Sequence, residues 1–245
     1  MTEQAVVLFT SCVGAMFGPA DDRGVGAGVA LRRLCERAGV RVIVPVDIDR
    51  LCCGTPWRSK GLDDGADVMA ARTMESLWEA SEGGRWPIVT DAASCTHGLR
   101  LSTHHLGDDA KERLAILHII DGVTFARALL PDLPPVRTRV GSLALHPTCS
   151  TEHLGTTDDL IALAEGVADE VTVPAEWGCC GYAGDRGMLH PELTAAATAR
   201  EAAEVEAGSF DAWASCNRTC EMGMQRATGR RYEHILEILE RATRE

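Results

Sequence analysis

The chain has 245 residues, of which 45% are hydrophobic and 24% are charged, as expected for a folded globular protein with a sizeable core. Its formal net charge of −12 argues against nucleic acid binding, which needs a basic face. No apolar run approaches the roughly 20 residues that span a bilayer, and the N-terminal run "MTEQAVVLFTSC" lacks the basic region of a signal peptide. We therefore expect a cytoplasmic protein without a transmembrane segment.

The first half of the chain alternates strand-like and helical runs, a pattern that predicts an α/β fold with largely parallel strands. The expected strands cover residues 5–12, 40–45 and 87–95, and the expected helices cover residues 25–38 and 66–81. A cysteine ends the first strand, a Cys-Cys-Gly sequence follows the second strand, and another cysteine ends the third.

The second half repeats this order. Its expected strands cover residues 142–149, 170–174 and 211–220, and its expected helices cover residues 158–169 and 191–208. The repeat predicts two pseudo-symmetric halves, residues 1–135 and 136–245, each a small, largely parallel sheet flanked by helices. The halves join near "LLPDLPPVRTRVGS", where prolines interrupt regular structure.

Spacing aligns the cysteines of the two halves. Cys53 precedes Cys95 by 42 positions, whereas Cys180 precedes Cys220 by 40 positions and Cys216 by 36. Cys220 is therefore the better counterpart of Cys95, and Cys216 is an extra and doubtful member. The resulting sets of four are Cys12, Cys52, Cys53 and Cys95 in the first half and Cys149, Cys179, Cys180 and Cys220 in the second half.

Four thiols in each half favour a soft metal centre. Because sites gather at the carboxyl ends of parallel strands, each set is expected to converge there and to bind an iron–sulfur cluster. Zinc is the alternative, although zinc sites usually space paired cysteines two to four residues apart. Redox-active thiols are another alternative, although the sequence has no Cys-x-x-Cys at a helix start.

The remaining residues near these sets have simpler interpretations. Cys35 shares a predicted helix face with Leu31 and Ala38, which indicates a buried core thiol. His97 and His146 lie near the cysteines in sequence, and we interpret them as hydrogen-bonding residues rather than ligands. The glycine after each cysteine pair lets the backbone approach sulfur and donate N–H groups to it.

The repeated pattern of strand–Cys, Cys-Cys-Gly and strand–Cys resembles the cysteine-rich CCG domain. That domain occurs in the heterodisulfide reductase B subunit, the glycolate oxidase iron–sulfur subunit and the lactate-utilisation iron–sulfur proteins. In the second half, "HPTCS", "WGCCGYAGDRGMLHPELTAAAT" and "NRTCEMG" also resemble the C-terminal part of fused FAD/iron–sulfur D-lactate or 2-hydroxyacid dehydrogenases.

The resemblance implies an electron-transfer module of a flavin-dependent 2-hydroxyacid dehydrogenase that is not active alone. It implies an iron–sulfur cofactor of the 4Fe–4S type, FAD on a partner or a missing domain, a ferredoxin-like partner, and peripheral association with the inner membrane through such partners. A thiol/disulfide oxidoreductase like heterodisulfide reductase and a zinc-binding or metal-free structural module are the alternatives. The family pattern ends in Cys-x-x-Cys, but Ala92 and Asn217 occupy the first of those positions here.

Few other motifs suggest a binding or catalytic role. "GVGAG" at 24–28 precedes a predicted helix, but it is too short to be a dinucleotide-binding fingerprint. Arg186 and Arg218 are candidates to donate hydrogen bonds to cluster sulfur or to bind an anionic acceptor. An ion-paired position at the rim of the sheet is the equally good alternative for each.

Overall fold

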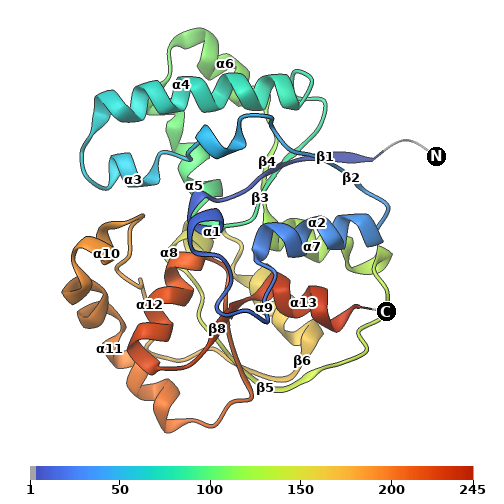
Figure 1. The fold of residues 1–245 in the computed structure, drawn as a ribbon, viewed down its shortest axis with the longest axis vertical. Coiled ribbons are helices and arrows are strands. Elements are labelled where there is room, and N and C mark those ends of the chain that lie inside the picture. Colours follow the sequence, from blue (N-terminus) through green and yellow to red (C-terminus); the bar gives the residue numbers. More distant parts are fainter. Residues whose placement is uncertain (1–3, 245) are drawn as a thin grey trace.

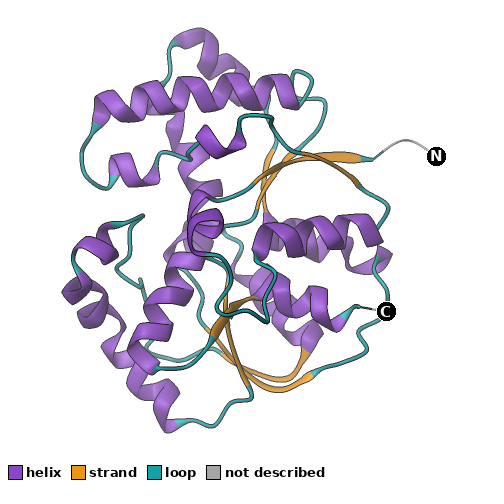
Figure 2. Ribbon diagram, in the orientation of Figure 1, coloured by secondary structure: helices purple, strands orange, loops and turns teal. Residues whose placement is uncertain are grey.

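The computed structural model describes residues 4–244, which form two four-stranded sheets whose neighbouring strands all run parallel (Figures 1 and 2). Their orders are β2-β1-β3-β4 and β6-β5-β7-β8. The strands are β1 (Ala5–Phe9), β2 (Arg41–Ile43), β3 (Ile88–Thr90), β4 (Ile119–Asp121), β5 (Val140–Leu145), β6 (Ala168–Thr172), β7 (Ala212–Ser215) and β8 (Tyr232–His234). In each half the second strand of the chain lies at one edge, followed across the sheet by the first, third and fourth strands. The prediction of an α/β fold with two similar halves is therefore confirmed.

The longer helices divide into an inner layer and an outer layer (Figure 1). The inner helices are α2 (Ala27–Arg37), α7 (Gly122–Leu129), α9 (Thr157–Val167) and α13 (Ile235–Ala242). The outer helices are α4 (Asp63–Ala80), α6 (Asp108–Ile116) and α11 (Pro191–Ala207). None of the helices within residues 4–244 combines the length and the apolar character needed to cross a bilayer.

The other helices are short or lie beside the cysteines. They are α1 (Cys12–Phe17), α3 (Thr55–Arg58), α5 (Ala93–Leu101), α8 (Cys149–Leu154), α10 (Arg186–Leu189) and α12 (Arg218–Thr228), with 3-10 turns η1 (Ile48–Arg50), η2 (Ser102–His105) and η3 (Leu130–Asp132). Two sequence predictions were wrong at this level. The first and third strands of each half stop before their cysteines, and each half contains a fourth short strand that was not predicted.

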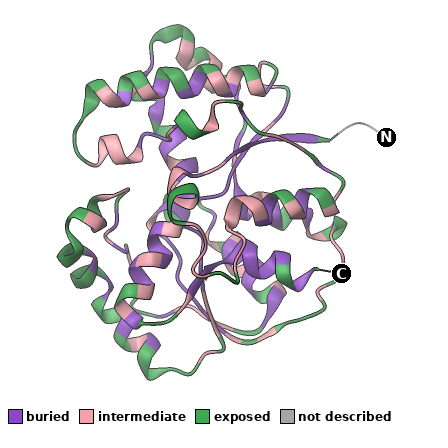
Figure 3. Ribbon diagram, in the orientation of Figure 1, coloured by how far each residue is buried: buried purple, intermediate pink, exposed green. Residues whose placement is uncertain are grey.

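The inner helices bury one hydrophobic core that both halves share (Figure 3). Alternation along β1 shows how the strand divides its side chains: Val6 and Leu8 face this core, whereas Val7 and Phe9 face a second core under α4. Helix α2 packs against α13 and α7 packs against α9, and these two contacts are equivalent because α2 corresponds to α9 and α13 corresponds to α7. Cys35 is 1% exposed within the shared core, as predicted.

Asp121 caps the inner helix α7. Its carboxylate accepts the Val123 N–H at 3.1 Å and the Thr96 hydroxyl at 2.9 Å, and burial raises its pKa from 3.8 to about 6. The folded protein therefore binds this proton more tightly than the unfolded chain, and the contribution of Asp121 to stability increases as the pH falls through 6.

Replacing Asp121 with asparagine should remove this pH dependence, because the amide oxygen can still accept from Val123 without ionising. In the iron-free chain, we expect the change in unfolding free energy caused by Asp121→Asn to be more favourable at pH 8 than at pH 4, by up to about 3 kcal/mol. Urea unfolding of both proteins across this range measures the difference. If the unfolding free energies of the two proteins changed with pH in parallel, Asp121 would not be the group responsible for this pH dependence.

Candidate metal centres

Cys12 and Cys149 occupy equivalent helix starts. Each is the first residue of a short helix, α1 or α8, that follows the central strand of its sheet. The Ser11 hydroxyl accepts the Gly14 N–H at 3.2 Å, and the Thr148 hydroxyl accepts a backbone N–H in the same way. Free N–H groups and the positive end of the helix dipole favour a thiolate at such positions.

Cys95 and Cys220 occupy a second pair of equivalent positions. Each is the third residue of a helix, α5 or α12, and each is buried. The expected strands over residues 87–95 and 211–220 are corrected here, since β3 ends at Thr90 and β7 ends at Ser215. The shift matters because it places the thiols in the first turns of helices, at the positive end of the helix dipole.

The adjacent cysteines lie on loops that turn at the following glycine. Gly54 and Gly181 have φ values of +86° and +72°, a left-handed conformation that favours glycine. The Gly181 N–H donates to Cys179 Sγ at 3.4 Å, and a hydrogen bond from the Gly54 backbone opposes the rise in the pKa of Cys52 that Cys12 and Cys53 cause. The predicted role of these glycines as N–H donors to sulfur is therefore confirmed.

The four thiols of the first half share protons with one another. A hydrogen bond from Cys52 lowers the pKa of Cys12, and a second one lowers the pKa of Cys53. The hydrogen bond to Cys53 raises the pKa of Cys95, and the one to Cys12 raises that of Cys52. All four predicted residues thus form one connected group.

In the second half the four thiols form two hydrogen-bonded pairs. The Cys180 and Cys220 Sγ atoms are 2.9 Å apart, and this hydrogen bond lowers the pKa of Cys180 to about 5. The hydrogen bond from Cys149 lowers the pKa of Cys179 to about 6. The hydrogen bond with Cys179 is the main cause that raises the pKa of Cys149, and the charge on Cys180 adds to the rise.

Cys216 lies apart from this arrangement. It is 1% exposed in the shared core, its Sγ atom lies 3.9 Å from the Thr148 hydroxyl, and burial raises its pKa. Burial likewise raises the pKa of Cys35 to about 12. Burial thus dominates the pKa of these two thiols, whereas hydrogen bonds between thiols dominate in the other eight.

Sequence reasoning missed a glycine three residues after Cys95 and Cys220. A Cβ atom on Gly98 would lie 2.7 Å from the Cys53 carbonyl oxygen, and one on Gly223 would lie 3.6 Å from Cys180 Cβ. The missing side chain at Gly98 therefore lets the Cys-Cys loop pack directly on helix α5. The repeated Cys-x-x-Gly pattern, "CTHG" and "CEMG", was the available signal.

The two histidines have different surroundings. His146 is fully buried, and its Nδ1 atom lies 2.7 Å from the buried Glu201 carboxylate. Burial works against a charged imidazole, but the neighbouring Cys180 thiol and the Glu201 carboxylate together raise the pKa of His146 to about 9. His97 stacks on His153, with ring centroids 4.9 Å apart, where α5 meets α8 between the halves.

The two candidate arginines bind groups of the protein itself. Arg218 pairs with Glu221 at 3.2 Å and donates to the Pro19 carbonyl at 3.1 Å. Arg186 donates to the Ser59 carbonyl, next to an ion pair of 2.6 Å that joins the loops of the two halves. These contacts match the ion-paired rim interpretation for Arg218, and a role toward a cluster stays a prediction for both.

The donor set fits a thiolate-bound group, although its present spacing does not. Within residues 4–244, no three His, Cys, Asp or Glu side chains are arranged to hold a metal ion. Cys180 and Cys220 illustrate the reason, since two thiolates on a tetrahedral ion with bonds of about 2.3 Å would be about 3.8 Å apart. Binding would therefore require the thiols to lose their shared protons and separate.

Comparison with known proteins agrees with this geometry. The family model of the cysteine-rich domain (CCG) matches residues 6–100 and 143–225, one match in each half and well over half of the chain. The chain belongs to the CCG cysteine-rich domain family. This family assignment confirms the resemblance that the cysteine pattern carried.

Two curated relatives align with this CCG protein along nearly all of its length. It is 21% identical to the glycolate oxidase iron-sulfur subunit of Escherichia coli, covering 98% of this chain and 58% of that subunit. It is 24% identical to lactate utilization protein A of Oceanobacillus iheyensis, covering 96% of each. The chain thus spans little more than half of the first relative and nearly all of the second.

Proposed function

We propose that this CCG protein is an electron-transfer module in which each set of four cysteines holds an iron–sulfur cluster of the 4Fe–4S type. The module receives electrons from an FAD-dependent dehydrogenase of a 2-hydroxy acid, of the glycolate or D-lactate kind, and passes them to a further acceptor. A ferredoxin-like domain or subunit completes the proposed assembly. The names of the two relatives support the choice of oxidoreductase and of substrate class.

The protein residues would bind and tune the centres. When bound, each cluster would accept and release single electrons. Cys12, Cys52, Cys53 and Cys95 would hold one cluster, and Cys149, Cys179, Cys180 and Cys220 would hold the other. The N–H groups of the left-handed glycines donate to sulfur, which stabilises negative charge on the ligands.

One observation carries the proposal: eight cysteines lie in two symmetry-related sets in which a neighbouring thiol is the main influence on the pKa of each, as in the Cys180–Cys220 hydrogen bond, whereas burial is the main influence for Cys35 and Cys216. A thiol that only fills a core has no reason to lie beside another thiol on a helix start or a glycine turn. Thiols placed together at N–H-rich positions are suited to becoming thiolate ligands at neutral pH.

Electron transfer from a partner tests the proposed function. We expect the anaerobically reconstituted chain to bleach when it is mixed with an FAD-dependent 2-hydroxyacid dehydrogenase and its substrate. The substrate alone should leave the spectrum unchanged, because the flavin belongs to the partner. Bleaching by the acid without the partner, or no bleaching by chemically reduced flavin, would contradict the proposal.

A further inference from the structure

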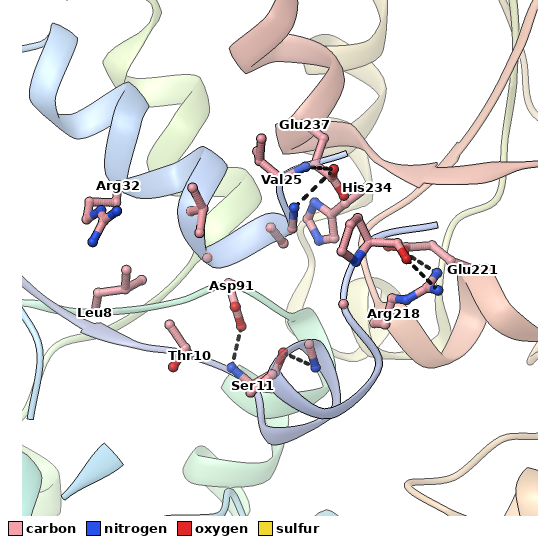
Figure 4. Close-up of a pocket in the computed structure, with 18 of the residues that line it drawn as sticks. Leu8, Thr10, Ser11, Val25, Arg32, Asp91, Arg218, Glu221, His234 and Glu237 are labelled. Atoms are coloured by element: carbon pink, nitrogen blue, oxygen red, sulfur yellow. Dashed lines mark hydrogen bonds and ion pairs between the residues drawn. The ribbon is translucent and has the colours of Figure 1, made fainter. Parts of the chain in front are cut away.

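A cavity of about 320 Å³ lies where the two halves meet (Figure 4). Its walls come from the end of β1, the loop before α2 and the residue after β2 in the first half. Helix α12 and the β8–α13 corner of the second half complete it. The cavity is mostly apolar, with Leu8, Ala15, Val25, Val29 and Val44 among the lining residues.

The cavity sits at a departure from the pseudo-symmetry. Helix α2 begins 15 positions after Cys12, whereas α9 begins eight positions after Cys149. The longer segment contains the glycine-rich run at 24–28, of which Val25, Gly26, Ala27 and Gly28 line the cavity. Its Val25 and Gly26 N–H groups are already occupied, because Glu237 Oε2 accepts them at 2.9 and 3.2 Å.

Three buried carboxyl groups face this space. Asp91, Glu221 and Glu237 are 3%, 1% and 3% exposed, and all three line the cavity. Glu221 Oε2 pairs with Arg218, but Glu221 Oε1 has no hydrogen-bond partner within the described part of the chain. Figure 4 shows Glu221, Arg218 and Glu237 at one end of the cavity and Arg32 at the other.

Two glycines keep the Asp91 carboxyl accessible. Its Oδ1 atom accepts the Ser11 N–H at 2.7 Å. A Cβ atom on Gly28 would lie 2.9 Å from Asp91 Oδ2, and one on Gly14 would lie 3.9 Å from it. The absence of side chains at these two positions therefore leaves space beside Oδ2 for another group.

Carboxyl groups outnumber cations in the cavity. Among the described residues that line it, the cations are Arg218 and Arg32, and Arg32 is exposed and lies 3.7 Å from Glu36. Arg218 thus remains as the cation beside three carboxyl groups at the buried end. Buried acceptors that lack a donor are costly, so a bound cation would remove a penalty that the chain alone retains.

We propose that this cavity binds a small organic cation, a primary amine on an apolar body, with its ammonium group between Asp91 and Glu221. The apolar walls contact the body of the ligand and the carboxyl groups accept its N–H bonds. A cluster of carboxyl groups disfavours an anionic 2-hydroxy acid, so the ligand proposed here differs from the substrate of the proposed electron-transfer assembly. A second observation, the unpartnered Glu221 Oε1 atom, distinguishes it from an ordinary structural acidic cluster.

Binding calorimetry with three matched probes tests the site on the whole chain. Benzylamine, benzyl alcohol and benzoate share an apolar ring and differ in charge. We expect benzylamine to bind at least about tenfold more tightly than the alcohol, since its ammonium group makes charge-assisted hydrogen bonds that a hydroxyl cannot make, and we expect benzoate not to bind. Equal affinity for amine and alcohol, or no binding of the amine, would overturn the proposal, as would Mg²⁺ binding that displaces the amine.

Matched glycine substitutions locate the bound amine. Gly28→Ala places a methyl group beside Asp91 Oδ2 and should weaken benzylamine binding at least about tenfold, while alanine favours the helix. Gly166→Ala on the equivalent helix α9 meets no atom within 4 Å and should leave binding unchanged. Equal binding to both variants would place the amine elsewhere. Amine affinity is measured without any iron–sulfur cluster. A negative result for the amine therefore leaves the proposed cluster binding untouched, and the reverse also holds.

Discussion

Replacing Cys95 with serine is expected to remove about half of the iron and sulfide that the chain takes up on anaerobic reconstitution. Replacing Cys220 should remove the other half, and the double variant should load almost none. The reason is that each thiol is buried in a different connected set, so each substitution breaks one cluster and leaves the other set intact. Iron and sulfide per chain, together with electron paramagnetic resonance of the reduced protein, measure this.

The two remaining cysteines supply matched controls. Cys35→Ala and Cys216→Ala each remove a buried thiol of the shared core, so iron loading per folded chain should not change. Loss of iron from Cys216→Ala would restore Cys216 as a fifth ligand in the second half. Stoichiometric zinc in place of iron, released by chelation with loss of fold, would support the structural zinc alternative.

The predictable part of the site follows from local pattern. Two Cys-Cys-Gly runs after strand-like sequences were enough to predict the cysteine loops and to pair the halves, because each signal spans a few neighbouring residues. The positions of Cys95 and Cys220 were only partly predicted. Their strands stop early because Ala92 and Asn217 lead into helices, and three-residue strands such as β4 and β8 leave almost no periodicity to read.

The shared core and the cavity could not be predicted from one sequence. Helix α2 shows an apolar face in isolation, but nothing in its residues says that the partner is α13, about 200 positions later. The same is true of Glu237, whose carboxylate binds the loop before α2. Such contacts depend on how two sheets face each other, which is a property of the whole fold.

The shared core leads to the second large effect. Leu31 on α2 is fully buried between the two sheets, so Leu31→Ala leaves a cavity in the core that both halves use. We expect the substitution to lower the free energy of unfolding by about 2–5 kcal/mol. Because α2 packs on α13 of the other half, both halves should lose stability together.

Hydrogen exchange resolved by mass spectrometry separates this outcome from independent domains. In Leu31→Ala, amides of β1–β4 and of β5–β8 should lose protection to the same extent and in one cooperative transition. Leu193→Ala, at a 45% exposed helix position, is the matched control and should cost less than about 1 kcal/mol. Selective loss of protection in residues 1–135 would instead mean that the halves are separate folding units. A joint loss would make the pseudo-symmetric pair one unit, in which the two cysteine sets are held at a fixed separation by a single core.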